Sequence, residues 1–185
     1  MSTVPFSASQ VEVDVLAVLN DKLPAYLDLM GLPHWRSTVN ENDMDRWRQD
    51  QLPSLIVMSP GLADTPRPLA RSTNEFLVRW AVAVGMVVSA ASEEATRTLS
   101  QAYAACIRTC LMHNRGLDGT ARSVDWMDER YDAMEPDDGS QLSLAAGQAT
   151  FQVEMHVKMG FAPPGVTIPV TSTGLEVELL PLEGS

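Results

Sequence analysis

The chain has 185 residues, 45% of them hydrophobic, with 24 acidic residues against 13 basic ones and a formal net charge of -11. The length suits one domain, and the acidic balance argues against a nucleic-acid binder, which would show a basic footprint. Two cysteines cannot form a secreted-type disulfide framework, and no apolar run approaches the ~20 residues of a membrane span. The first residues also lack the basic and apolar regions of a signal peptide, so we expect a soluble protein made in a reducing cytoplasm.

The first predicted element is a helix over residues 9–30. Alternation over residues 11–15 could instead begin a strand, but the longer helical pattern outweighs it. Pro24 predicts a kink or the start of a second short helix, and Gly31 ends the run. The apolar residues at helical spacing are Val11, Val15, Leu16, Leu19, Leu23, Tyr26, Leu27 and Met30.

Residues 32–51 are polar and predict a surface connection with one short helical turn around residues 44–47. Trp35 and Trp47 lie in this connection. Large aromatics are unusual there unless they cap the edge of the domain or contact a partner, and both possibilities stay open. A short strand is predicted over residues 52–59, and it should stop at Pro60-Gly61. Residues 61–72 contain two prolines and predict an exposed loop or an extended arm.

The central strand is predicted over residues 75–88, which alternate with a period of two. One face is apolar, whereas Glu75, Leu77 and Arg79 lie on the other. At ~3.3 Å per residue the strand spans roughly 45 Å, compared with ~17–20 Å for a usual strand. We therefore expect it to run past its own sheet into a hairpin arm or a neighbouring subunit, with these three residues at the contact.

A helix should follow, with Ser92 as its N-cap and carboxylates in its first turn. Its apolar stripe continues to residue 111, and glycines at 116 and 119 end the run. A strand with one apolar face followed by a helix with one apolar stripe is a two-layer packing unit.

Two more strands are predicted after this helix. Residues 122–126 form the first, with Val124 and Trp126 inward, and residues 128–140 are acidic and turn-rich. Residues 148–159 alternate strictly between polar and apolar, which favours an antiparallel sheet. Like Trp80 and Phe151, Trp126 is expected in the core. The predicted fold class is α/β (α+β): an antiparallel sheet of about four strands with two helices packed on one face, plus an extended hairpin arm or loop.

Cys106, Cys110 and His113 lie on one face of the second predicted helix, four and three residues apart. Three such ligands could hold zinc if a fourth came from elsewhere, and a cysteine beside a histidine could act as a nucleophile with its base. A reactive thiol, however, needs an electropositive and partly exposed setting, and this helix face is apolar. We therefore favour two core cysteines and predict no catalytic residue, no cofactor and no metal.

The order of these pieces resembles a known family. A helix leads to "LPSLIVMSPG", then to "FLVRWAVAVGMVVSA", "SEEATRTLSQAYAACIRTCLMHNRGLDG", "ARSVDWMDERYD" and "ATFQVEMHVKMG". This pattern is similar to the tail-terminator (tail-completion, minor tail) proteins of long-tailed bacteriophages, and it covers roughly residues 8–163. The resemblance implies a tail-terminator-like domain over residues 1–163 and a C-terminal extension over residues 164–185, which either packs on the domain or reaches a neighbour.

The resemblance also implies a function. In that family a sheet flanked by two helices forms each subunit, and six subunits form a ring that caps the head-proximal end of the tail tube. The implied partners are other copies of the chain, the tail tube protein and the head-completion or connector protein, with DNA passing through the lumen unbound and no membrane. The implied location is the virion, and the host cytoplasm during assembly. One alternative is another neck or head-tail connector protein; another, from a different class, is a small Cys/His-dependent hydrolase or metalloenzyme.

Overall fold

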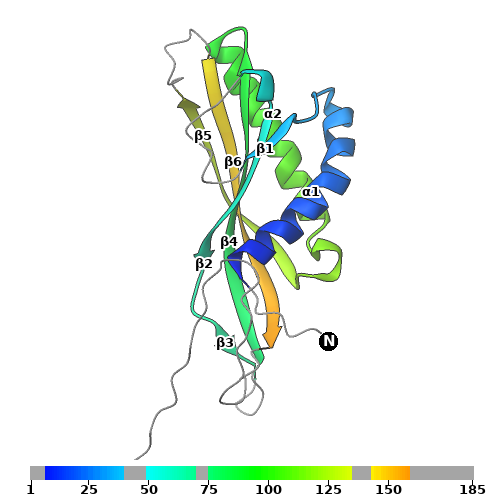
Figure 1. The fold of residues 1–185 in the computed structure, drawn as a ribbon, viewed down its shortest axis with the longest axis vertical. Helices are drawn as coiled ribbons and strands as arrows, with labels where there is room; N and C mark the ends of the chain where they lie inside the picture. The colour runs from blue at the N-terminus through cyan, green and yellow to red at the C-terminus, as the bar shows by residue number, and fades with distance from the viewer. Residues whose placement is uncertain (1–6, 40–48, 70–74, 135–142, 159–185) are drawn as a thin grey trace, which may run out of the picture.

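The computed structural model describes residues 7–39, 49–69, 75–134 and 143–158. Two long helices pack on one face of a six-stranded sheet (Figure 1), which confirms the predicted α+β class. The elements in chain order are α1 (Ala8–Met30), β1 (Ser37–Val39), η2 (Gln49–Gln51), β2 (Ser54–Leu62), β3 (Arg67–Pro68), β4 (Glu75–Ala90), α2 (Glu93–His113), η3 (Leu117–Gly119), β5 (Ser123–Met134) and β6 (Ser143–Lys158).

The sheet has the order β1-β2-β4-β6-β5, and β3 also pairs with β4. The β4 and β6 strands pair along their full lengths, from Glu75 opposite Lys158 to Ala90 opposite Ser143. They form the spine, with β5 on one side and with β2 and β3 along the other. The four predicted strands are confirmed, and two short ones join them. The β1 strand runs parallel to β2 and β3 has two residues, so neither is long enough to show a period.

One face of the sheet is covered by the helices. Apolar side chains of β4 and β6 alternate onto this face, where α1 and α2 exclude water from them, and this burial is the main stabilising term of the fold. The largest fully buried side chains of the covered face are Leu55, Met86, Phe151 and Met155 from the strands, Leu19, Leu23 and Leu27 from α1, and Tyr103, Ile107 and Leu111 from α2.

The opposite face of the sheet carries neither helix. In its middle, β4 presents only Ala81, Ala83 and Gly85, which lie opposite Gln152, Thr150 and Gln148 of β6. A small second cluster of Leu52, Ile56, Val87 and Leu144 is buried toward the Ala90 end. This open face is therefore apolar at one end and small or uncharged in the middle.

The helix ends follow local sequence. Ser92 caps α2, because its Oγ accepts a hydrogen bond from the Ala95 N–H at 3.2 Å, as predicted. Gly31 ends α1 at a φ of 65°, which suits glycine. The expected second helix at Pro24 is wrong, since α1 continues through this proline. The stripe of buried leucines continues on both sides of Pro24, and its packing outweighs the lost backbone hydrogen bond.

Three strand boundaries differ from the prediction. The β2 strand does not stop at Pro60-Gly61, because a register shift between Met58 and Gly61 accommodates the proline at the sheet edge. The β5 strand continues to Met134 through residues expected to form turns, and β6 begins at Ser143 rather than Gln148. The expected turn at residues 44–47 and the extension over residues 164–185 lie outside the described residues.

The long predicted strand is confirmed, but the expectation that it runs past its own sheet is wrong, because β6 pairs with it from Glu75 to Ala90. The strand and its sheet together extend past the helices. In Figure 1, the beginning of β4, the end of β6 and β3 continue below the first turn of α1. We call this part, made of β3, residues 75–77 and residues 156–158, the arm. Arg67 and Pro68 of β3 pair with Leu77 and Phe76 of β4, so the arm has three strands.

Candidate assembly surface

The two cysteines of α2 are built into the core. Cys106 is 4% exposed and Cys110 is fully buried. Burial raises the pKa of the Cys106 thiol above its usual value and raises that of Cys110 to about 12. Both thiols are therefore protonated at neutral pH, whereas a thiol nucleophile must be a thiolate. His113 directs Nδ1 to the hydroxyl of Tyr26 on α1 at 3.0 Å, so it links the two helices.

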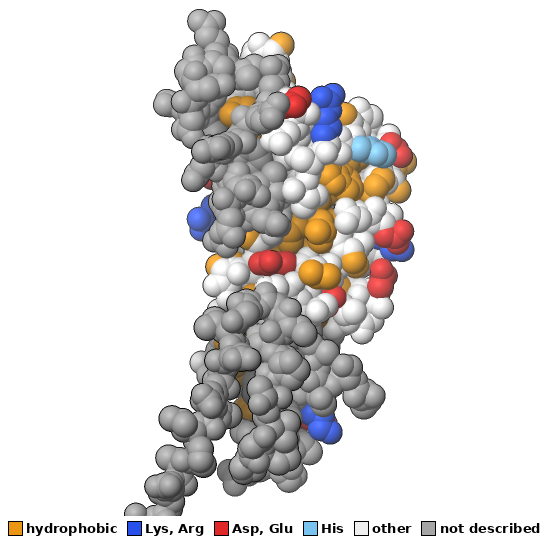
Figure 2. Space-filling model, in the orientation of Figure 1, with side chains coloured by type: hydrophobic (Ala, Val, Ile, Leu, Met, Phe, Trp, Pro, Cys, Tyr) orange, Lys and Arg blue, Asp and Glu red, His pale blue; other side chains and the backbone are white. Residues whose placement is uncertain are grey.

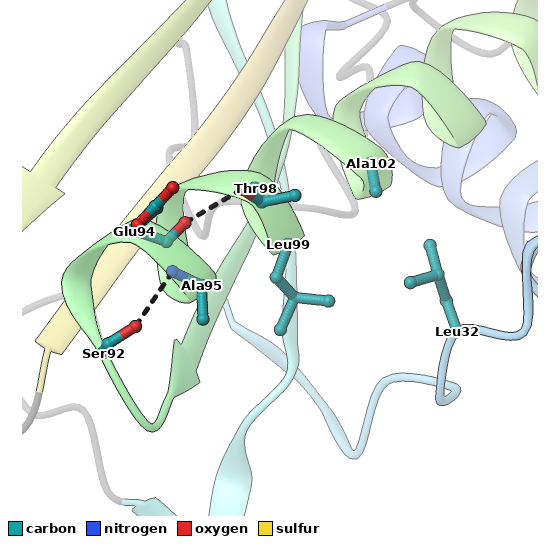
Figure 3. Close-up of a pocket in the computed structure, with 7 residues that line it drawn as sticks. All are labelled: Leu32, Ser92, Glu94, Ala95, Thr98, Leu99 and Ala102. Carbon is teal, nitrogen blue, oxygen red and sulfur yellow. Dashed lines mark hydrogen bonds between the residues drawn. The ribbon is translucent and has the colours of Figure 1, made fainter.

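A hollow opens between the first turns of α2 and the chain after α1 (Figure 3). Its volume is about 490 Å³, and Leu32, Ala95, Leu99 and Ala102 give it an apolar lining. Its polar groups are used within α2, since the Ser92 hydroxyl caps the helix and the Thr98 hydroxyl donates to the Glu94 carbonyl oxygen. Figure 2 shows hydrophobic side chains gathered on this helix-bearing side of the molecule. The hollow presents apolar surface rather than a set of converging reactive groups.

The predicted contact residues of β4 lie at the arm end of the open face. Glu75 stands opposite Lys158, and Leu77 lies between β3 and His156 of β6. Arg79 bridges two carboxylates, with Nε 2.8 Å from Glu154 and Nη1 3.1 Å from Asp64. All three side chains of the predicted group are half-buried. Arg79 is thus held by ion pairs within the subunit, which its sequence position did not indicate.

Arg79 belongs to a row of charges across the open face. Glu154 also contacts Arg122, just before β5, with Nε at 3.5 Å, and Asp64 also contacts Arg67 of β3 at 3.7 Å. Alternating charges therefore connect β3, β4, β6 and the start of β5. The side chains of the inner members, Asp64, Arg79 and Glu154, are 32%, 28% and 13% exposed, so the row ties the base of the arm to the rest of the sheet.

Trp35 does not lie with these residues. It is half-buried against the core in the chain that leads to β1. Since β1 pairs through β2 with the Val87 end of β4, Trp35 and Glu75 are at opposite ends of the sheet. Trp35 thus packs at the edge of the core, and its contact with a partner stays a prediction. Trp47 lies outside the described residues.

No sequence pattern predicts the exposed surface on β5. Trp126, Met127 and Tyr131 are 46%, 61% and 38% exposed on this outer strand. The prediction of a buried Trp126 is wrong: it shares a sheet face with Val124, which is fully buried, but β5 is the edge strand and the core does not enclose the indole. The aromatic residues of this stretch were the signal that could have indicated an exposed surface, but the acidic residues between them predicted turns instead.

This surface is held in place by one arginine of α2. The Arg108 guanidinium lies over the Trp126 ring, 4.9 Å from its centroid, and pairs with Glu129. The other oxygen of Glu129 accepts the Tyr131 hydroxyl at 2.6 Å. The Trp126 Nε1–H donates to the Asp128 carbonyl oxygen at 3.1 Å. The edge of β5 therefore presents ordered aromatic side chains to solvent.

The described residues hold no group of three His, Cys, Asp or Glu side chains arranged to bind a metal ion. Neither α1 nor α2, the two long helices of the described chain, has a stretch apolar enough to cross a bilayer. The surface features of the described residues are the arm, the open face, the apolar hollow and the aromatic edge of β5. Comparison with known proteins gives no match, either to a family model or to a curated protein.

Proposed function

We propose that this protein is a structural virion protein that caps the head-proximal end of a bacteriophage tail tube as a homomeric ring. In this role it stops the tube from growing and provides the surface to which the head connector attaches. The tail tube protein and the head-completion protein are its partners, and DNA passes through the lumen without specific binding.

The observation that carries the proposal is the one-sided fold, in which no described element pairs with the outer edge of β5. The helices stabilise only one face of the sheet, and the exposed aromatics of β5 lie on an edge rather than over the core. Exposed aromatic surface of this kind is typical of protein contacts. The order of helices and strands supports the resemblance to tail-terminator proteins, and an acidic chain suits a lumen that does not hold DNA.

Mass photometry and electron microscopy of the purified chain test the proposal. We expect annular particles of roughly six times the 20.2 kDa subunit mass, formed alone or on tubes assembled from the tail tube protein of the same genome. Added protein should also stop the growth of these tubes. A chain that stays monomeric and leaves tube growth unchanged would contradict the proposal. Binding only to tubes already capped by another protein would instead indicate a connector.

The enzyme alternative is tested by replacing both cysteines with alanine. Cys106 and Cys110 are buried, so the double variant should lose stability through lost packing, by roughly 1–3 kcal/mol, and still assemble. Loss of a measured hydrolytic rate in a variant that remains folded would favour the Cys/His-dependent enzyme.

A further inference from the structure

The exposed large hydrophobic residues of the described chain fall on two opposite flanks. One flank is β5, and the other is formed by β2, β3 and the outer side of α1, which packs on β2. Figure 1 shows β5 and β2 on opposite edges of the twisted sheet. The β5 flank carries Trp126, Met127 and Tyr131, and the opposite flank carries Val13, Leu29, Met30, Leu62 and Leu69.

The β5 flank is arranged like the centre of a protein interface. Trp, Tyr and Arg are the residue types that most often dominate binding energy, and Trp126, Tyr131 and Arg108 occur here together. Glu129 fixes both Arg108 and Tyr131, so these side chains lose little conformational entropy when a partner covers them. The patch is ready to bind without rearrangement.

On the opposite flank, Leu62 is the counterpart at the sheet edge. The parallel strand β1 pairs with β2 only from Ser54 to Ile56. Beyond this stretch, α1 satisfies one backbone donor, because the Ser59 N–H donates to a Glu12 carboxylate oxygen at 2.6 Å. Leu62 ends the strand with 49% of its surface exposed.

The two flanks are also at nearly the same level of the sheet. Leu62 pairs with Trp80, Trp80 with Val153, and Val153 with Val124, so these four residues form one row on the helix-bearing face. Trp126 is two residues farther along β5, an offset of roughly 7 Å. Contacts between two different surfaces close into a ring when each step adds rotation without a rise, and otherwise they make a filament.

The charges of the two edges differ. The β5 strand carries Asp125, Asp128, Glu129 and Asp132 against Arg130. On the other edge, Arg67 is balanced by Asp64, and the Glu12 carboxylate of α1 lies at Ser59, so this edge carries less negative charge than β5. A second copy of β5 would therefore repel β5 more strongly than the β2–β3 edge would.

We propose that neighbouring subunits join head to tail, with the Trp126, Met127 and Tyr131 patch of one copy seated on the Leu62 edge of the next. This inference rests on the proposed ring. The contact is made by side chains and does not continue the backbone ladder, because a bulge at Met127 and the charges of β5 oppose strand pairing. The strands then run along the ring axis, and the rows of the sheet run around it.

Cysteine cross-linking of the full chain tests the contact. Leu62→Cys and Met127→Cys are prepared separately. The native cysteines of α2 are buried, so they should contribute little cross-linking of their own. Under mild oxidation we expect disulfide-linked dimers when the two variants are mixed, and neither variant alone should give them. A chain with both substitutions should give a ladder up to the full ring. Dimers from Met127→Cys alone would show a symmetric contact and would overturn the inference, as would a ring that yields no cross-link.

Loss of the indole is the second test. Trp126→Ala should raise the protein concentration at which rings dissociate, on the order of 30-fold, measured by mass photometry. Thr98→Ala is the control, since Thr98 is exposed on α2 beside the hollow, on neither flank, and its loss should leave the ring unchanged. Both variants should melt close to the parent temperature.

The outcomes separate the two proposals. If the parent chain forms rings but Trp126→Ala forms them equally well, the head-to-tail contact is wrong and the proposed function stands. If the parent chain forms no ring at any concentration or on tubes, the proposed function fails and this inference fails with it.

Discussion

The two faces of β4 show how one strand serves two purposes. Toward the helices, Val82, Val84 and Met86 are fully buried. The residues that alternate with them on the other face are Ala81, Ala83 and Gly85, which lie opposite uncharged polar side chains of β6. The same backbone therefore carries a thick apolar layer on one side and a nearly flat surface on the other. The difference indicates that stability is concentrated on the covered face, so the open face does not need to bury large apolar side chains.

The largest expected effect comes from opening the covered face. Phe151→Ala should lower the free energy of unfolding by roughly 3–5 kcal/mol, because Phe151 is 1% exposed in the main core. Gln152→Ala, the next residue on the open face, should change it by less than about 0.5 kcal/mol. Urea unfolding measures both. Similar losses for the two variants would break the comparison between the faces.

Two glycines on opposite faces of the sheet sharpen the comparison between the faces further. A Cβ at Gly147 would overlap the Ser100 carbonyl oxygen of α2, so Gly147→Ala must push the helix away from the sheet. We expect a loss of about 1–3 kcal/mol in unfolding free energy. At Gly85, on the open face, the nearest atom is the Gly147 carbonyl oxygen at 3.2 Å, and Gly85→Ala should cost less than about 1 kcal/mol. A more damaging Gly85→Ala would contradict the assignment of α2 to one face.

Groups buried on the covered face should also make the free energy of unfolding depend on pH in the alkaline range. Burial raises the pKa of Cys110 from 9.0 to about 12. Between these values the unfolded thiol loses its proton while the folded one keeps it. The unfolded state then binds fewer protons, and stability falls as pH rises, by at most about 1.4 kcal/mol per pH unit for one group.

Thermal melts from about pH 8 to about pH 11 would measure this slope. Cys110→Ala should start less stable and lose stability less steeply above about pH 9. Burial also raises the pKa of Tyr103 to about 12, so part of the slope should remain in the variant. An unchanged slope would mean that Cys110 is not shielded from water as the structure has it.

The smallest effect is expected for the charge row of the open face. Glu154→Gln removes the carboxylate that Arg79 and Arg122 share, and should cost about 1 kcal/mol or less, because the arginines keep some contact with water. The loss should shrink in high salt. Asp132→Asn, which removes an exposed charge on β5, is the control and should have almost no effect. A loss comparable to that of Phe151→Ala would place a large part of the stability on the open face.

The strongly periodic elements could be predicted from sequence because a single interaction, burial against one neighbouring layer, determines their pattern. The β4 strand and α2 are examples. The cap at Ser92 could be predicted for a different reason, because it depends only on a local hydrogen bond to Ala95. The continuation of β5 beyond Trp126 could not be predicted, because most of its side chains there are exposed and need not alternate. The role of Arg79 depends on Asp64 and Glu154, which come from other strands, and spacing along the chain carries no information about such pairs.

The candidate surface shows the same division. Glu75, Leu77 and Arg79 were predicted together because they are neighbours in one strand, and they do lie together. Trp35 is predicted as a contact residue because it is a large aromatic in a polar segment, but the fold places it at the other end of the sheet. The β5 aromatics were missed because their exposure depends on where β5 falls in the strand order.

The full pairing of β4 with β6 also determines at which stage of folding the arm forms. Ala90 and Ser143 are the partners closest in sequence, so joining them costs the least loop-closure entropy, and the ladder should zip from there toward Glu75 and Lys158. The arm is thus the last part of the ladder to close and the first to fray. Any partner that binds the arm would therefore recognise only chains that have finished folding.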